Sequence, residues 1–269
     1  AVLESIEEQG KLTDELKQAI LAADTKARVE DLYLPYKKRR QTKADIAREA
    51  GLEALEQQLI DDPSADPETL AKAYLSEGFP DAKSALEGAR AILVDRFATD
   101  ADLVGEVRDR VYSQGTMRSA VVEGKETEGA KFADYFEFSE PFEKLPSHRI
   151  LALLRGEAEG VLTLDMDPGE EAVYEGMIAE RFDLPVKDSE WLAKAVRWGW
   201  RTKLQVSANL DTRMRLQEKA EEGALQVFKT NLRDVLLAAP AGQRATLALD
   251  PGYRNGVKCA VVDETGKVL

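Results

Sequence analysis

The sequence predicts a mainly α-helical protein, a multi-helix scaffold that ends in a short β-rich segment. Apolar residues recur at helical spacing through most of the first 240 residues. Helix-capping residues stand ahead of these periodic stretches, and Pro240 and Gly242 stop the last of them. After Gly242 the pattern changes to β-branched, apolar runs that are typical of strands.

The order of helices follows from their capping residues. Thr42 with Asp45 has the spacing of a capping box, and Asp66 precedes a proline at the first helical position. The expected helix starts are Thr13, Thr42, Asp66, Asp81, Thr99 with Asp102, Ser147, and Asp167 with Pro168. A long helical tract is then expected from Ser189 to about Leu237, broken near residues 207–211.

One face of that long tract is rich in aromatic residues. It carries Trp191, Ala195, Trp198 and Thr202, with Lys194, Arg197 and Arg201 beside them. We interpret this face as the buried side of an amphipathic helix.

The β-rich segment consists of two expected strands. The first strand is expected at residues 245–250 and the second at residues 256–263, with a turn at Pro251 and Gly252 between them. Residues 264–266 predict a hairpin loop with Gly266 at a positive φ. Two strands alone are marginally stable, so we expect them to lean on the helical part or to be poorly ordered. Residues 161–166 predict a further strand, alone between helices.

Composition limits the classes of function. The 269 residues carry 37 basic and 50 acidic side chains, a net charge of −13, and no run approaches the roughly 18 apolar residues of a membrane helix. Cys259 is the only cysteine and His148 the only histidine, so the chain cannot form an internal disulfide or a zinc site built from several Cys or His ligands. We therefore expect a cytoplasmic protein with no metal site, no cofactor and no membrane contact. The first and last residues resemble the middle of a helix and of a strand, so we expect a piece of a larger protein.

A basic tract interrupts this acidic chain. Five of the seven residues from 37 to 43 are positive, and the stretch from Lys26 to Arg48 has a net charge of +5. Such asymmetry suits contact with a phosphate backbone. A solvated surface loop that pairs with acidic neighbours stays open as an alternative. The candidate binding residues are Lys37, Lys38, Arg39, Arg40 and Lys43.

Two further constellations have a chemical and a structural interpretation. Five aromatic residues are close together in the sequence after Lys125 and Lys131: Phe132, Tyr135, Phe136, Phe138 and Phe142. They would either stack on nucleic-acid bases or fill a small apolar core, and we favour the core. Asp250 closes the first expected strand before a glycine turn. This position suits a metal ligand of an RNase H-type nuclease, a phosphate-binding turn of an actin-like ATPase, or a carboxylate that caps its own turn.

Several motifs resemble those of the bacterial Tex (transcription accessory) proteins, over essentially the whole chain and in the right order. They lie at residues 31–36 (DLYLPY), 46–53, 124–132, 134–136, 146–149 and 231–242. Residues 249–252 (LDPG) with 256–258 resemble the start of that family's RNase H-like, YqgF-type domain. Two positions depart from the family: Lys38 stands where a proline is usual, and Ala248 where a glycine is common.

The resemblance implies a cytoplasmic nucleic-acid-binding protein linked to transcription, with RNA or DNA and the transcription machinery as partners. It places helix-hairpin-helix repeats and an S1 domain beyond Leu269. The expected domains are a helical region at 1–140, a helical region leading to a long helix pair at 141–243, and the first two strands of a truncated RNase H-like domain at 244–269.

Three functions remain in competition: a helical scaffold with accessory nucleic-acid binding, which we favour, a Mg²⁺-dependent nuclease or resolvase that uses Asp250, and an actin-like ATPase. Two-metal chemistry needs several carboxylates, and Asp250 alone does not supply them. We therefore expect no enzymatic activity.

Overall fold

The computed structural model describes residues 2–37, 41–239, 242–254 and 256–269. Helices account for 61% of it, which confirms the mainly α fold. The chain divides into a first unit, Ala1–Glu221, and a second unit, Glu222–Leu269. None of the helices in the described ranges has the length and apolar character that a membrane crossing requires.

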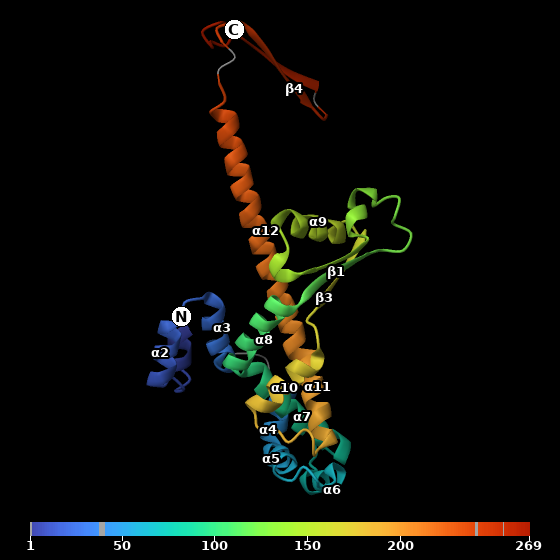
Figure 1. Cartoon of the computed structure of the whole chain (residues 1–269). Helices are drawn as coiled ribbons and strands as arrows, with labels where there is room; N and C mark the ends of the chain where they lie inside the picture. The colour runs from blue at the N-terminus through green and yellow to red at the C-terminus, as the bar shows by residue number, and fades with distance from the viewer. Residues whose placement is uncertain (1, 38–40, 240–241, 255) are drawn as a thin grey trace. The chain divides into compact units, whose positions relative to one another are not determined.

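The first unit is built from helices and one small sheet (Figure 1). Its α-helices are α1 (Val2–Glu7), α2 (Asp14–Ala22), α3 (Lys26–Tyr33), α4 (Lys43–Glu49), α5 (Glu53–Asp61), α6 (Pro67–Ala71), α7 (Ala82–Thr99), α8 (Ala101–Gln114), α9 (Ser147–Ala158), α10 (Glu171–Arg181), α11 (Glu190–Gly199) and the start of α12 (Gln205–Leu236). Short 3-10 helices lie at Leu34–Tyr36, Lys72–Tyr74, Ala130–Tyr135 and Phe142–Lys144.

Most of the predicted helix starts are confirmed. Thr13, Asp66 and Asp81 each accept a hydrogen bond from the backbone N–H three residues on, and Thr42 with Asp45 forms the complete capping box. These caps satisfy N–H groups that have no partner within the helix, so a local spacing is enough to reveal them.

Two predicted starts are wrong, and at a third only the predicted cap is wrong. Thr99 is the last residue of α7, where its hydroxyl donates to the carbonyl of Asp95, and Asp100 caps α8 by accepting from Leu103 N–H at 2.8 Å. Asp167 ends β3 (Leu162–Asp167), and α10 starts only at Glu171. Helix α9 does begin at Ser147, but the Ser147 hydroxyl donates to the carbonyl of Lys219 and does not cap the helix.

The helices α4, α5 and α6 pack against α7 (Figure 1). Between them lies a compact apolar cluster of fully buried residues: Ala47, Leu52, Leu55, Leu59, Ala71, Ala85, Ala89 and Ile92. Gly88 permits this approach, because a Cβ at that position would lie 2.4 Å from Leu52 and 2.9 Å from Phe79. This packing fixes the position of α4, whose first residue is Lys43.

The first unit also contains a three-stranded antiparallel sheet. Strand β1 (Thr116–Val121) pairs with both β2 (Glu137–Pro141) and β3 (Leu162–Asp167), in the order β2-β1-β3. The strand expected at 161–166 is confirmed as β3, but the expectation that it lies alone between helices is wrong. The sheet joins segments on both sides of residue 140, and it packs on the larger apolar core. Phe132 and Phe142 are buried there with the other three aromatic residues against them, which agrees with the core interpretation.

The long tract is not broken at 207–211. A five-residue π-helix at Trp200–Leu204 instead joins α11 to a continuous α12. Trp200 is fully buried and stacks on Tyr174 with ring centroids 4.2 Å apart. The aromatic face is only partly core: Ala195 is buried, but Trp198 and Thr202 are exposed. The buried side of α11 is rotated toward Leu192, Val196 and Gly199.

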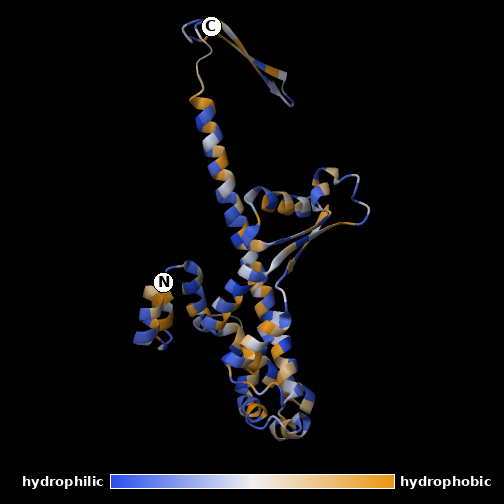
Figure 2. Cartoon of the chain, viewed as in Figure 1, coloured by the Kyte–Doolittle hydropathy of each residue, from blue (hydrophilic) through white to orange (hydrophobic). Residues whose placement is uncertain are grey.

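The second unit holds the end of α12 and a β-hairpin of β4 (Thr246–Gly252) and β5 (Gly256–Val262). Pro251 and Gly252 lie within β4 and pair with β5, so the prediction that they form the turn is wrong. Gly266, at φ 85°, follows in the expected loop. All of β4 is exposed. Hydrophobic colouring recurs along α12 in Figure 2. The exposed hydrophobic residues of α12 in this unit include Leu225, Phe228, Leu232, Val235 and Leu236.

Candidate nucleic-acid interface

The basic tract lies between two well-defined structural elements. Lys37 directly follows the 3-10 helix at Leu34–Tyr36, and Lys43 is the first residue of α4; both are exposed. Lys38, Arg39 and Arg40 lie outside the described residues. Neither Lys37 nor Lys43 forms an ion pair with any residue that the structure describes. Their charges are therefore open to an external partner.

The segment before the tract is anchored by the 31–36 motif. Asp31, only 4% exposed, receives two hydrogen bonds from the Arg108 guanidinium, one of them 3.2 Å long, so α3 is tied to α8. The Tyr33 hydroxyl shares a hydrogen bond with Ser5 at 2.9 Å, and the Tyr36 carbonyl accepts from Gln9 at 2.8 Å. The motif thus holds the residue before Lys37 in place from two sides.

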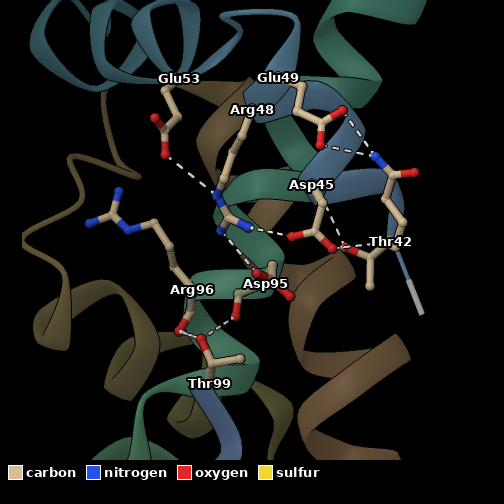
Figure 3. Close-up of polar contacts among 9 residues, drawn as sticks. Thr42, Asp45, Arg48, Glu49, Glu53, Asp95, Arg96 and Thr99 are labelled. Carbon is tan, nitrogen blue, oxygen red and sulfur yellow. Dashed lines mark hydrogen bonds and ion pairs between the residues drawn. The ribbon is translucent and has the colours of Figure 1, made fainter. Parts of the chain in front are cut away.

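The segment after the tract is anchored by Arg48 (Figure 3). Its guanidinium lies 3.3 Å from Asp45, 3.4 Å from Glu53 and 2.9 Å from Asp95, measured nitrogen to oxygen. Asp45 is also the capping-box partner of Thr42, so one carboxylate orders the first turn of α4 and holds Arg48. Because Asp95 belongs to α7, this network fixes α4 and its first residue, Lys43, to the helical core.

Ion pairs neutralise most of the basic stretch outside the tract. Arg28 donates to Asp102 at 2.7 Å, and this hydrogen bond is the main reason why the pKa of Asp102 is lowered. Lys26 lies 3.7 Å from Glu30, and Arg48 is surrounded by carboxylates. The candidate interface is therefore narrower than the stretch from Lys26 to Arg48, and it consists of the tract itself.

Sequence inspection did not identify Arg48 and Arg28 as internally paired residues. Asp45 and Arg48 are three residues apart, a spacing that permits an ion pair on one helix face, so the sequence could have indicated this pair. The partners Asp95 and Asp102 lie 47 and 74 positions away, where no local pattern reveals them.

The second candidate, Asp250, stands on the exposed surface of β4. Its side chain is 76% exposed and lies 3.9 Å from the ammonium of Lys258 on the neighbouring strand. Asp263 accepts hydrogen bonds from Thr265 and Lys267 in its own loop, and these lower its pKa. Across the described ranges, no group of three or more His, Cys, Asp or Glu residues is arranged to hold a metal ion. Asp250 is thus a single carboxylate here.

The fold and this site define a helical module in which anchored segments lie on either side of a basic tract, and which continues into a β-rich segment. Residues 62–228 match the family model described as Tex central region-like, and residues 244–269 match that of the Tex protein YqgF-like domain. The chain belongs to the Tex family.

Relatives cover the whole of this chain. It is 53% identical to transcriptional accessory protein Tex of Neisseria gonorrhoeae and 48% identical to protein YhgF of Escherichia coli, over 36% of each of those proteins. It is 27% identical to S1 RNA-binding domain-containing protein 1 of Homo sapiens, over 28% of that protein. The chain therefore spans about a third of the length of the relatives it matches.

Proposed function

We propose that this chain is a helical scaffold and accessory nucleic-acid-binding module of a transcription accessory protein. Its tract contacts the phosphate backbone of RNA or DNA without reading sequence, through Lys37, Lys38, Arg39, Arg40 and Lys43. The observation that carries this proposal is that Lys37 and Lys43 have no ion-pair partner among the described residues and lie between two anchored segments. The charges of Lys37 and Lys43 at the two ends of the tract are therefore available to a phosphate backbone, which favours binding.

The net charge supports an accessory role. At −13 the chain as a whole repels a polyanion, so a dominant nucleic-acid clamp is not expected within it. The family resemblance places the principal binding modules, helix-hairpin-helix repeats and an S1 domain, in further parts of such proteins. We propose that the complete protein acts in the cytoplasm together with the transcription machinery, with this chain as the framework on which its binding modules are arranged.

The experiment is charge reversal of the five tract residues to Glu. Binding of the variant and of the unchanged chain to single-stranded and duplex oligonucleotides is measured over a series of salt concentrations. We expect weaker binding and a shallower dependence of log K on log salt, by about 0.7 to 0.9 for each phosphate that the variant no longer neutralises.

A matched control separates local contact from general repulsion. It reverses five lysines elsewhere on the surface, Lys11, Lys17, Lys72, Lys83 and Lys144, and so changes the net charge by the same amount. Binding that falls equally in both variants would contradict a specific role for the tract and favour the solvated-loop interpretation.

The alternative function is a Mg²⁺-dependent nuclease that uses Asp250, favoured by the match of residues 244–269 to the YqgF-like domain. We propose instead that the chain is not an enzyme, because Mg²⁺ dehydrates reluctantly and a single exposed carboxylate holds it weakly. The test is incubation with Mg²⁺ or Mn²⁺ and branched, single-stranded and duplex substrates. Cleavage that disappears in Asp250→Asn would establish the nuclease in place of this proposal.

A further inference from the structure

The side chain of Trp198 on α11 is unusual for its exposure. It is 51% exposed, whereas Trp200, two residues later, is fully buried. The cause is the neighbouring residue Gly199, where a Cβ would lie 2.7 Å from the ring of Phe97 on α7. This turn of α11 therefore lies close against α7, and the indole of Trp198 is held on the outer side. A single exposed apolar residue does not by itself indicate a binding site, so the case for one at Trp198 depends on the residues around it.

Basic side chains surround this indole. The Arg90 guanidinium of α7 lies over the Trp198 ring, 4.5 Å from its centroid. Lys194 lies one helical turn before Trp198 and Arg201 three residues after it, with side chains 68% and 56% exposed. The segment from Glu190 to Leu204 has four basic residues and one acidic residue, a net charge of +3 in a chain of −13, and Glu171 and Glu175 of α10 pair with Arg201 and Arg197.

The ion pairs of Lys194 and Arg201 differ in how readily a phosphate can replace them. Lys194 pairs with Glu190 on its own helix at 2.7 Å, and because both side chains are largely exposed, solvent screens this pair. Arg201 donates three hydrogen bonds to Glu171, the shortest 2.6 Å long, so a phosphate at Arg201 must take their place. Arg90 has no carboxylate partner among the described residues, and its guanidinium lies over one face of the Trp198 ring, so a base would stack on the other face of the ring or on the guanidinium itself.

We propose that Trp198, with Arg90 over its ring, is a base-stacking site for single-stranded nucleic acid, and that Lys194 and Arg201 contact the adjoining phosphates. An exposed indole provides a flat surface on which any base can stack, and nearby cations follow the backbone. Because the helix packing already holds the ring outward, little conformational entropy is lost on binding. The inference rests on the proposed nucleic-acid function and adds a second site to it.

The test compares two oligonucleotides of equal length, oligo(dT) and an abasic strand with the same number of phosphates. The 269-residue chain is titrated with each, and affinity and tryptophan fluorescence are measured. We expect Trp198→Ala to weaken oligo(dT) binding roughly 5- to 150-fold, the range for one stacked base, and to leave abasic binding and the salt dependence unchanged. Trp198→Phe should retain part of the affinity, and Leu210→Ala, at a site 60% exposed on α12, should have no effect.

The outcomes separate this inference from the proposed function. If Trp198→Ala reduces the affinity for both strands equally, or reduces neither, the stacking site is overturned. Trp198 and Arg90 would then be better explained as contacts for a protein partner, because Trp and Arg are also enriched in protein–protein interfaces. If the tract reversal still flattens the salt dependence in that case, the proposed function stands alone. If the unchanged chain binds neither strand, both proposals fail.

Discussion

Among single residues, Asp31 and Arg108 form the most deeply buried ion pair in the described part of the first unit. The two side chains are 6% and 15% exposed, and Asp211 lies 3.8 Å from the same guanidinium. Burial raises the pKa of Asp211, which means that the surroundings of this carboxyl group disfavour its charged form. Removal of Asp31 would leave the buried Arg108 guanidinium with only the longer contact to Asp211.

The first prediction concerns this pair. Asp31→Ala is expected to lower the free energy of unfolding by about 3 kcal/mol, because Arg108 would keep its desolvation cost and lose its hydrogen bonds. Urea unfolding followed by circular dichroism measures the change. The control is Glu175→Ala, which breaks a pair with the 53% exposed Arg197 and should cost less than about 1 kcal/mol. Similar destabilisation in both variants would contradict the assigned importance of the 31–36 motif.

The second prediction concerns Glu56, which is 3% exposed on α5. Burial raises its pKa, although the hydrogen bond from Arg96 acts in the opposite direction. Since the folded-state pKa lies above the unfolded value of about 4.3, the stability contribution of Glu56 is present below that pH. It is lost as the pH rises through the folded-state pKa.

The corresponding variant is Glu56→Gln, which retains the shape and an acceptor for Arg96. Its stability relative to the unchanged chain should increase from pH 4 to pH 7, as measured by urea unfolding at several pH values. Glu190→Gln is a control of opposite sign, because Lys194 lowers the pKa of Glu190. A stability difference for Glu56→Gln that does not change with pH would refute the burial argument.

Among the connections between elements, Gly115 is the point where α8 ends and the sheet begins. A Cβ there would lie 2.5 Å from the ring of Phe142, 2.6 Å from the carbonyl oxygen of Val111 and 2.8 Å from that of Asp167. Two of these atoms belong to the backbone and cannot turn aside as a side chain does. The junction between α8, β1 and the end of β3 therefore requires glycine.

The third prediction compares two glycines. Gly115→Ala should destabilise the first unit by about 1–3 kcal/mol, because the close approaches force backbone shifts. Gly176→Ala, inside α10 with no atom within 4 Å of the added Cβ, should stabilise it by about 0.5–1 kcal/mol through helix propensity. Thermal unfolding of both variants gives the signs. A stabilising Gly115→Ala would show that this junction is looser than the distances indicate.

Across the molecule, the two units differ in how much they bury. The first has an extensive core that includes the face of the three-stranded sheet. In the second, β4 and nearly all of β5 are exposed, and α12 presents unburied apolar residues. A two-stranded hairpin without a covered face is marginally stable in water. Such a segment opens far more often than a core strand.

The fourth prediction follows from this difference. In native-state hydrogen exchange, the paired amides of β4 and β5 should exchange orders of magnitude faster than those of β1 and β3, which are packed on the core. Mass spectrometry of peptides from 246–262 and 116–121 makes the comparison within one sample. Equal protection of the two sheets would mean that the hairpin is covered in solution.

Short spacings along the chain were enough to predict the mainly α fold, most of the expected helix starts and the position of the basic tract, and the resemblance of several motifs gave the family. The caps at Thr13, Thr42, Asp66 and Asp81 act on N–H groups only three residues away, so each is readable from its own neighbourhood. A run of five cations within seven residues is equally local.

Packing between distant segments determines which residues meet, and no local pattern predicted it. The pairing of β1 with β3, the contact of Asp31 with Arg108 across 77 positions and the exposure of Trp198 are of this kind. Helical periodicity placed Trp198 on the core face, but Gly199 packs against Phe97 and the side chain of Trp198 is exposed, although Ala195 on the same face is buried. Burial depends on how whole elements pack against one another, and periodicity within one element does not specify that.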